Sequence, residues 1–407
     1  MNKILTLLLI LCLLPACSDS LTEENQPHQQ TTQLENKLIG IAQKAIAECH
    51  PGRANEIQVA NVIPCPSRMV FKKNNLGRAE TIMVPDTMIY LVNFQNQNGC
   101  VIVSDCELIS DAIAIIPENN LSVEDITDDD ALSYYFELFL DSYLLGSIGN
   151  TFSEDDVQDI MSTYANSETD DEEWHTRVTY SKSNIVAKWG TGNPYNMYCF
   201  TPSGNAAQAY YADVAVAQLL TFYEQPVKIN GYNIDWANLH FTYPSNKAQA
   251  EAVGRLVHEI GVLNHTIYDE DLTWRLDVEI TDDLGTFYPV STLEPLKDSF
   301  NYICELFPTE EKMIHNIIDY GPALLSGTAL DEDGNEHRKY TWVVDGAQAR
   351  SRTINQKYEY RFFYRCNWGN NGKNNGYFLS TAFNPLGPYS NYHINHHVYT
   401  TYFIEKK

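Results

Sequence analysis

Four stretches of the chain repeat apolar residues at the three- and four-residue spacing of a helix face. They lie at about residues 34–48, from residue 131, at 209–223 and at 248–263. In the third stretch the apolar face is broad enough to predict a helix buried on most sides. That helix opens with two bulky aromatics, Tyr210 and Tyr211, where small or capping residues are more usual. Its apolar face comprises Ala212, Ala215, Val216, Leu219, Leu220 and Tyr223.

Shorter runs rich in β-branched and aromatic residues indicate strands in two groups. The first group precedes the helix at 131, and residues 96–99 form a probable turn between two of its members. The second group follows the last helix and reads as an antiparallel sheet. A helical region followed by a sheet predicts an α+β fold for the second half of the chain. The predicted strands are 67–73, 87–94, 100–105, 323–330, 340–347, 358–368, 375–383 and 396–405.

The N-terminus has the proportions of an export signal. Lys3 is followed by an apolar run from Ile4 to Leu14, which is too short to span a bilayer. Residues 14–17, Leu-Pro-Ala-Cys, resemble a bacterial lipobox, in which Cys17 would be lipidated and become the mature N-terminus. An ordinary cleaved signal with an incidental cysteine is the alternative. The sequence thus predicts an exported lipoprotein of the outer membrane or cell surface, attached to the membrane through its lipid.

The length of the chain limits the number of domains, and its net charge limits the kinds of partner. The 407 residues suffice for two domains, each with its own core. We expect a signal at 1–17, a flexible tether at 18–33, a first domain at 34–163, an acidic linker at 164–182 and a second domain at 183–407. The net charge of -26 argues against nucleic acid as a partner, because phosphates would be repelled.

Motifs of the second half follow one another in a recognisable order. They resemble the streptopain family of papain-fold cysteine peptidases, whose pattern runs W-x-Q-x-x-P-Y-N, G-C-x-A-T-A-x-A-Q, G-H-A-x-V-I-D-G, N-W-G-W-G-G, D-G-Y-F and N-P. Residues 89–118 also resemble the inhibitory prodomain of that family. The resemblance implies a streptopain-type α+β prodomain followed by a papain-like α+β domain. The matching segments here are residues 188–196, 210–220, 339–346, 367–372, 376–378 and 384–385.

The resemblance also assigns positions to a papain-type site. Such a site needs a cysteine at a helix N-terminus, a histidine beside it, a glutamine at the oxyanion and an orienting asparagine and tryptophan. In this chain Tyr211 stands at the nucleophile position, Tyr340 at the base position and Thr191 at the oxyanion position. Asn367 and Trp368 retain the orienting positions. Order and spacing are therefore those of the family, but the reactive groups are missing.

Tyrosine is a poor substitute for the missing groups. A phenol titrates near pH 10, so Tyr211 holds its proton at neutral pH and Tyr340 is no base for it. The side chain of Thr191 is too short to reach the oxyanion as a glutamine side chain does. Three other residues lie at unsuitable offsets from the matching positions, and none is expected to replace the missing groups: Cys199, Cys366 and His337.

No cofactor and no metal site is predicted. His393, His396 and His397 are the one histidine group near the C-terminus. The adjacent pair would point to opposite faces of a strand, and no acidic residue stands next to it. We interpret the three as incidental.

Three functions remain open at this stage. The first is an inactive homologue, a pseudo-peptidase, that binds a peptide, a protein or a partner peptidase. The second is an active cysteine endopeptidase with an unrecognised nucleophile, and the third is a structural or adhesive surface lipoprotein. The tyrosines either fill an abandoned site or reshape it for binding. An open groove at Tyr211 and Tyr340 would favour binding there, and a filled one would favour a scaffold.

Overall fold

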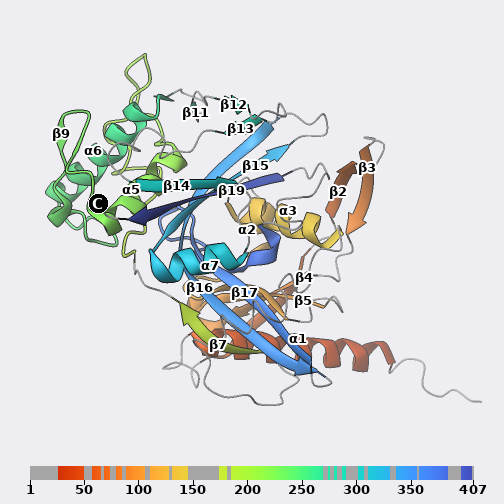
Figure 1. The fold of residues 1–407 in the computed structure, drawn as a ribbon. Helices are drawn as coiled ribbons and strands as arrows, with labels where there is room; N and C mark the ends of the chain where they lie inside the picture. The colour runs from red at the N-terminus through yellow and green to blue at the C-terminus, as the bar shows by residue number, and fades with distance from the viewer. Residues whose placement is uncertain are drawn as a thin grey trace, which may run out of the picture. The chain divides into compact units, whose positions relative to one another are not determined.

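A computed structural model describes the fold of this chain (Figure 1). The described residues are 26–49, 57–65, 68–73, 79–84, 89–105, 111–127, 131–144, 174–180, 185–268, 274–275, 279–281, 287–289, 301–306, 310–330, 336–354, 357–383 and 396–405. Residues 1–37 and 38–407 form two compact units. Within the second unit, residues 38–144 are called the N-terminal segment and residues 174–405 the C-terminal segment.

Most described strands join one antiparallel sheet of 11 strands. Its order is β1-β4-β5-β6-β18-β17-β16-β15-β19-β14, and β7 pairs with β16 beside this path. The strands are β1 (Val59–Pro64), β4 (Ile89–Phe94), β5 (Cys100–Ser104), β6 (Ala112–Ile116), β7 (His175–Tyr180), β14 (Asn301–Leu306), β15 (Ala323–Leu330), β16 (Glu336–Ile354), β17 (Lys357–Asn367), β18 (Gly376–Leu379) and β19 (His396–Glu405).

Four two-stranded sheets stand apart from the large one. Their strands are β2 (Arg68–Lys73) with β3 (Ala79–Val84), β8 (Lys228–Ile229) with β9 (Tyr232–Asn233), β10 (Thr266–Ile267) with β11 (Trp274–Arg275), and β12 (Glu279–Thr281) with β13 (Phe287–Pro289). The helices are α1 (Gln26–Cys49), α2 (Val123–Thr127), α3 (Ala131–Leu144), α5 (Tyr211–Tyr223), α6 (Lys247–Leu263) and α7 (Glu310–Asp319). The α+β class predicted from the sequence is confirmed.

The sheet runs without a break from the N-terminal to the C-terminal segment. β6 pairs with β18, with Ile115 opposite Tyr377 and Ala114 opposite Phe378. Gly376 is needed at this joint, because a Cβ there would lie 2.3 Å from the carbonyl oxygen of Ile115. Every residue of β4, β5 and β6 is buried. This explains their continuous apolar sequences, since strands covered on both faces do not alternate.

Two sequence predictions need correction. The first helix begins at Gln26 rather than near residue 34. The second half of the predicted tether at 18–33 is therefore part of α1. The predicted linker at 164–182 includes β7, which pairs with β16 from Ala347 to Ser351. Its polar, acidic composition concealed a strand whose pairing partner lies about 170 residues further along the chain.

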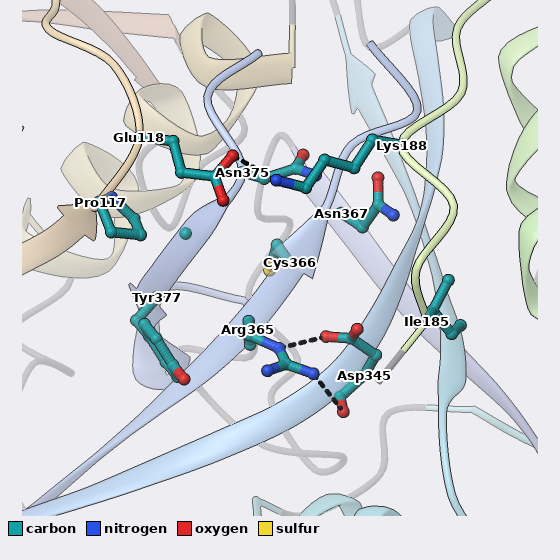
Figure 2. A pocket seen from close by; sticks show the side chains of 11 residues that line it. Pro117, Glu118, Ile185, Lys188, Asp345, Arg365, Cys366, Asn367, Asn375 and Tyr377 are labelled. Atoms are coloured by element: carbon teal, nitrogen blue, oxygen red, sulfur yellow. Dashed lines mark hydrogen bonds and ion pairs between the residues drawn. The ribbon is translucent and has the colours of Figure 1, made fainter. Parts of the chain in front are cut away.

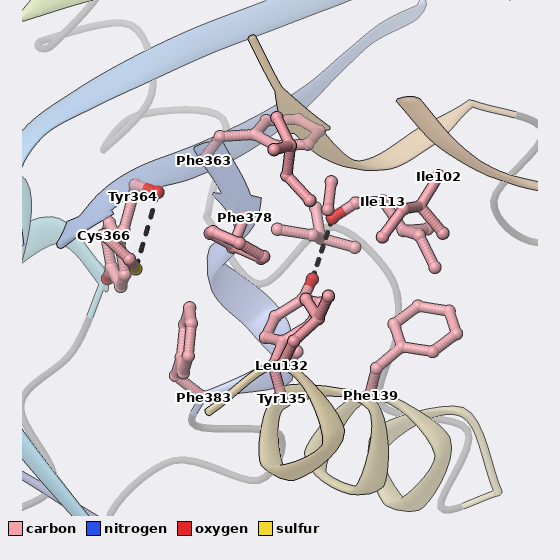
Figure 3. Close-up of a cluster of buried hydrophobic side chains, with 14 of the residues drawn as sticks. Ile102, Ile113, Leu132, Tyr135, Phe139, Phe363, Tyr364, Cys366, Phe378 and Phe383 are labelled. Carbon is pink, nitrogen blue, oxygen red and sulfur yellow. Dashed lines mark hydrogen bonds between the residues drawn. The ribbon is translucent and has the colours of Figure 1, made fainter. Parts of the chain in front are cut away.

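Most of the buried apolar residues in the described ranges form two clusters. The first, called the shared cluster, draws residues from Cys65 to Phe139 and from Met313 to Phe383, so both segments contribute to it. The second, called the C-terminal cluster, contains residues 187–260 together with Leu324 and Val343, all from the C-terminal segment. The expectation that each domain has its own core is therefore wrong for the shared cluster, which both segments build together. Figure 3 shows part of the shared cluster, where side chains of α3 lie against those of β17 and β18.

Among the described residues, no helix combines the length and the apolar character needed to cross a membrane. The predicted signal at 1–17 and its Cys17 lie outside the described residues, so export and lipidation stay predictions.

Candidate active site

The candidate site is centred on the N-terminus of α5. Tyr210 occupies the N-cap position with extended backbone angles, and its side chain makes no capping hydrogen bond. Its carbonyl accepts from the backbone N–H groups of Asp213 and Val214 at 3.0 and 3.2 Å. Tyr211 is the first residue of the helix, and the Tyr210 hydroxyl donates to the Tyr211 hydroxyl at 3.3 Å. The side chain at residue 211 thus lies where a helix N-terminus would stabilise an anion.

Tyr340, in β16, lies directly against Tyr211. The two rings stack with centroids 4.6 Å apart and planes inclined by 6°. The Tyr340 hydroxyl donates to the carbonyl of Trp368 at 3.1 Å. The structure therefore brings the nucleophile and base positions together, although they are 129 residues apart in sequence. The stacked rings occupy the space in which a nucleophile and its base would meet.

A third tyrosine, from the N-terminal segment, continues the stack. Tyr134 of α3 lies 6.4 Å from the ring of Tyr340, with planes inclined by 23°, and meets Trp342 edge-on at 6.0 Å. Tyr134 is fully buried. Sequence reasoning missed this residue, because the resemblance assigns no site position within the helix at 131–144.

The side chain of Asn367 bonds to α5 and to the segment before Thr191. Its side-chain amide donates to the carbonyl of Ala187 at 2.8 Å and to the side-chain oxygen of Gln218 at 3.1 Å. The same oxygen of Gln218 accepts from the backbone N–H of Trp189 at 3.0 Å. Asn367 and Gln218, both buried, therefore tie the end of β17 to α5 and to the segment before Thr191. Sequence analysis missed Gln218, although it stands at the glutamine of the A-x-A-Q motif.

Trp368 and Thr191 complete the predicted set. Trp368 is fully buried, and its indole N–H donates to the carbonyl of Asn374 at 3.0 Å. Its ring meets Tyr340 edge-on at 6.3 Å. The carbonyl of Thr191 accepts from the backbone N–H of Ala209 at 2.8 Å, which holds this loop beside the start of α5. All five positions are thus gathered around one helix end, while their roles by family correspondence stay predictions.

The two cysteines considered as replacements are buried thiols. Burial raises the pKa of Cys199 to about 11, even though Tyr268 provides a hydrogen bond that lowers it. Burial also raises the pKa of Cys366 well above its ordinary value. A thiol with a raised pKa keeps its proton at neutral pH and is a poor nucleophile. Neither residue has the surroundings of an activated cysteine.

The histidines offer no metal centre among the residues that the structure describes. No group of three or more histidine, cysteine, aspartate or glutamate residues in those ranges is arranged to hold a metal ion. His337 lies near the start of β16, and His396 and His397 begin β19. His393 lies outside the described residues.

A pocket of about 160 Å³ is lined by residues that follow β6, by Ile185 and Lys188, and by residues of β16, β17 and β18 (Figure 2). Arg365 donates through Nε to Asp345 at 2.6 Å, and Lys188 pairs with Glu118. Burial raises the pKa of Asp345, although Arg365 opposes this shift. Because each cation already has a carboxylate partner, the pocket presents no uncompensated charge. Neither Tyr211 nor Tyr340 lines it.

Comparisons with known proteins include the part of the chain that forms the candidate site. The sequence model of the Peptidase C10 family matches residues 189–378, which include every predicted site position from Thr191 to Trp368. This segment, slightly less than half of the chain, therefore matches the peptidase C10, or streptopain, family that the motifs resemble. No curated protein matches it.

Solved structures of the C10 family are also similar. A cysteine-to-alanine mutant of a Prevotella intermedia prointerpain A fragment has 16% sequence identity and a TM-score of 0.49, covering 84% of this chain and 99% of its own. The active wild-type interpain A cysteine protease of the same organism has 18% identity and a TM-score of 0.38, covering 58% of this chain and 97% of its own.

Proposed function

We propose that this chain is a catalytically inactive C10 homologue, a surface lipoprotein that binds a protein, a peptide or a partner peptidase without cleaving it. The observation that carries the proposal is the stacking of Tyr211 on Tyr340 at 4.6 Å. A peptidase of this type needs a thiolate at the first residue of the helix and an imidazole beside it. Two protonated phenols supply neither group.

The filled position also bears on where a partner would bind. The rings of Tyr211 and Tyr340 take the space of the reacting groups, and Tyr134 packs behind Tyr340. This favours a scaffold role for the fold, with contacts to a partner made on surfaces outside this stack. A structural or adhesive lipoprotein is therefore the second candidate, and the same stacking favours it.

The test uses residues 18–407, the chain without its signal and the lipidated Cys17, incubated with a mixed peptide library and with an epoxide-type thiol probe. We expect no new cleavage products and no labelled cysteine by mass spectrometry. Tyr211→Phe should behave as wild type, because residue 211 performs no chemistry. Turnover that a thiol reagent abolishes, and that persists in Tyr211→Phe, would establish a nucleophile elsewhere and refute the proposal.

Attachment to the membrane is tested separately. We expect Cys17→Ala to lose acyl label and to leave the membrane fraction, because the thiol is the acceptor in a lipobox. Ser18→Ala is the matched control and should keep both properties. Unchanged fractionation and label in Cys17→Ala would contradict lipidation at this cysteine.

A further inference from the structure

The N-terminal segment makes extensive contacts with the C-terminal segment, through both the sheet and the core. It supplies β1, β4, β5 and β6 to the common sheet, and β6 is hydrogen-bonded to β18 at the joint. Without it, β18 would become a sheet edge, with an unpaired row of backbone groups. β18 is short, and its residues Phe378 and Leu379 belong to the shared cluster, so the exposed edge would lie beside that cluster.

Apolar packing across the joint is extensive. Tyr135 of α3 is fully buried, lies 4.8 Å from Phe378 and 5.3 Å from Phe383, and donates to the carbonyl of Ile113 at 2.8 Å (Figure 3). Tyr134 packs in the same way on Tyr340 and Trp342. Removing the N-terminal segment would expose these aromatic faces to water. Burial of such side chains is the main source of stability in a core.

Polar contacts fix the register of the joint. Arg350 of β16 and Asp111, each 1% exposed, form an ion pair at 3.2 Å. Asn119 and Asn374 exchange two hydrogen bonds, from the Asn119 side-chain amide at 3.0 Å and from the Asn374 backbone N–H at 3.1 Å. Buried ion pairs contribute more to specificity than to stability, because desolvation offsets their attraction. These groups therefore define how the segments fit, while the aromatic packing holds them.

We infer that the N-terminal segment is a permanent structural part of the folded protein, which stays bound to the C-terminal segment even after the chain between them is cut. This inference does not rest on the loss of catalysis, because the sheet joint and the packing of Tyr135 lie outside the nucleophile and base positions. It goes beyond the proposed function by identifying the partner of the β18 edge and of the aromatic face around Tyr340. That partner is the chain's own N-terminal segment.

The experiment introduces a recognition sequence for a specific protease between residues 164 and 173 of the mature chain. After complete cutting, gel filtration at about 1 µM should show both pieces in one peak, in 0.1 M and in 1 M NaCl. Salt should have little effect because the contacts are apolar or buried. Separation of the pieces at either salt concentration, with or without loss of native circular dichroism, would overturn the inference.

Gly376→Ala tests the joint itself in the cut protein. The added methyl would collide with the backbone at Ile115, so we expect at least a tenfold faster dissociation of the pieces. Gly40→Ala in α1 is the matched control, because a Cβ there meets nothing within 4 Å and dissociation should be unchanged. Equal dissociation rates for the two variants would show that the β6–β18 joint does not hold the segments together. If Gly376→Ala does not fold, the wild-type result alone decides.

Discussion

The shared cluster and the C-terminal cluster differ in which parts of the chain complete them. The shared cluster needs side chains from both segments, whereas the C-terminal cluster is built within the C-terminal segment. The tyrosine pair joins the two: Tyr340 packs against the shared cluster, and Tyr211 opens α5, whose body belongs to the C-terminal cluster. The N-terminal segment is thus part of one core and, among the described residues, contributes nothing to the other.

The largest expected effect comes from the shared cluster. Tyr135→Ala removes a fully buried ring and should lower the free energy of unfolding by about 3–5 kcal/mol, the usual cost of a large aromatic truncation. Hydrogen exchange should increase in β5 and in β17 together, because both segments depend on the same cluster. Faster exchange confined to the N-terminal strands would show that the C-terminal strands do not depend on the shared cluster.

The C-terminal cluster should respond locally. Leu256 of α6 is fully buried, and Leu256→Ala should cost about 2–4 kcal/mol. Exchange should increase in α5 and α6 and stay unchanged in β4 and β5, which lie in the other cluster. An equal increase in all four elements would show that the two clusters unfold as one.

The contact between the clusters should show a smaller coupling. A double-mutant cycle with Tyr211→Ala and Tyr340→Ala should give a coupling energy of about 0.5–1.5 kcal/mol, as stacked aromatic pairs do. Tyr340→Ala paired with Tyr223→Ala, at the other end of α5, is the control and should be additive. Additivity in the first cycle as well would mean that the rings do not interact in solution.

The smallest signal is expected from the buried thiols. Because burial raises the pKa of Cys199 to about 11, its alkylation by iodoacetamide in the native protein should be near background at pH 7. A raised pKa keeps the thiol protonated, so labelling should increase only as the pH approaches that value. Cys199 labelled rapidly at pH 6–7 would reveal an activated thiolate and revive the alternative of an active enzyme.

The sequence predicted well those elements whose pattern is local. The helices α5 and α6 follow an apolar face of helical period, and β15 and β19 match the predicted strands at both ends. The pairing of β6 with β18 and of β7 with β16 was missed, because it joins residues far apart in the chain and leaves no local signal. β7 was further concealed by its polar neighbours.

The candidate site was predictable only as far as the family motifs reach. The resemblance located Tyr211 and Tyr340 and so implied their contact, which the structure shows. It did not predict that Asn367 bonds Gln218 and Ala187, because the partner of a side chain is not part of a motif. Nor did it predict Tyr134, since that residue enters the site from the other segment.

The central claim is that residues 211 and 340 hold the geometry of a catalytic pair without its chemistry. The most direct measurement is the alkylation rate at position 211 in the mature chain carrying Tyr211→Cys, Tyr340→His and Thr191→Gln. At pH 6 the helix N-terminus and the imidazole should lower the thiol pKa and make alkylation about tenfold faster than for a free cysteine. Replacing Tyr340→His by Tyr340→Phe in this variant should remove most of that gain. A folded triple variant whose position 211 reacts no faster than an ordinary exposed thiol would contradict the account.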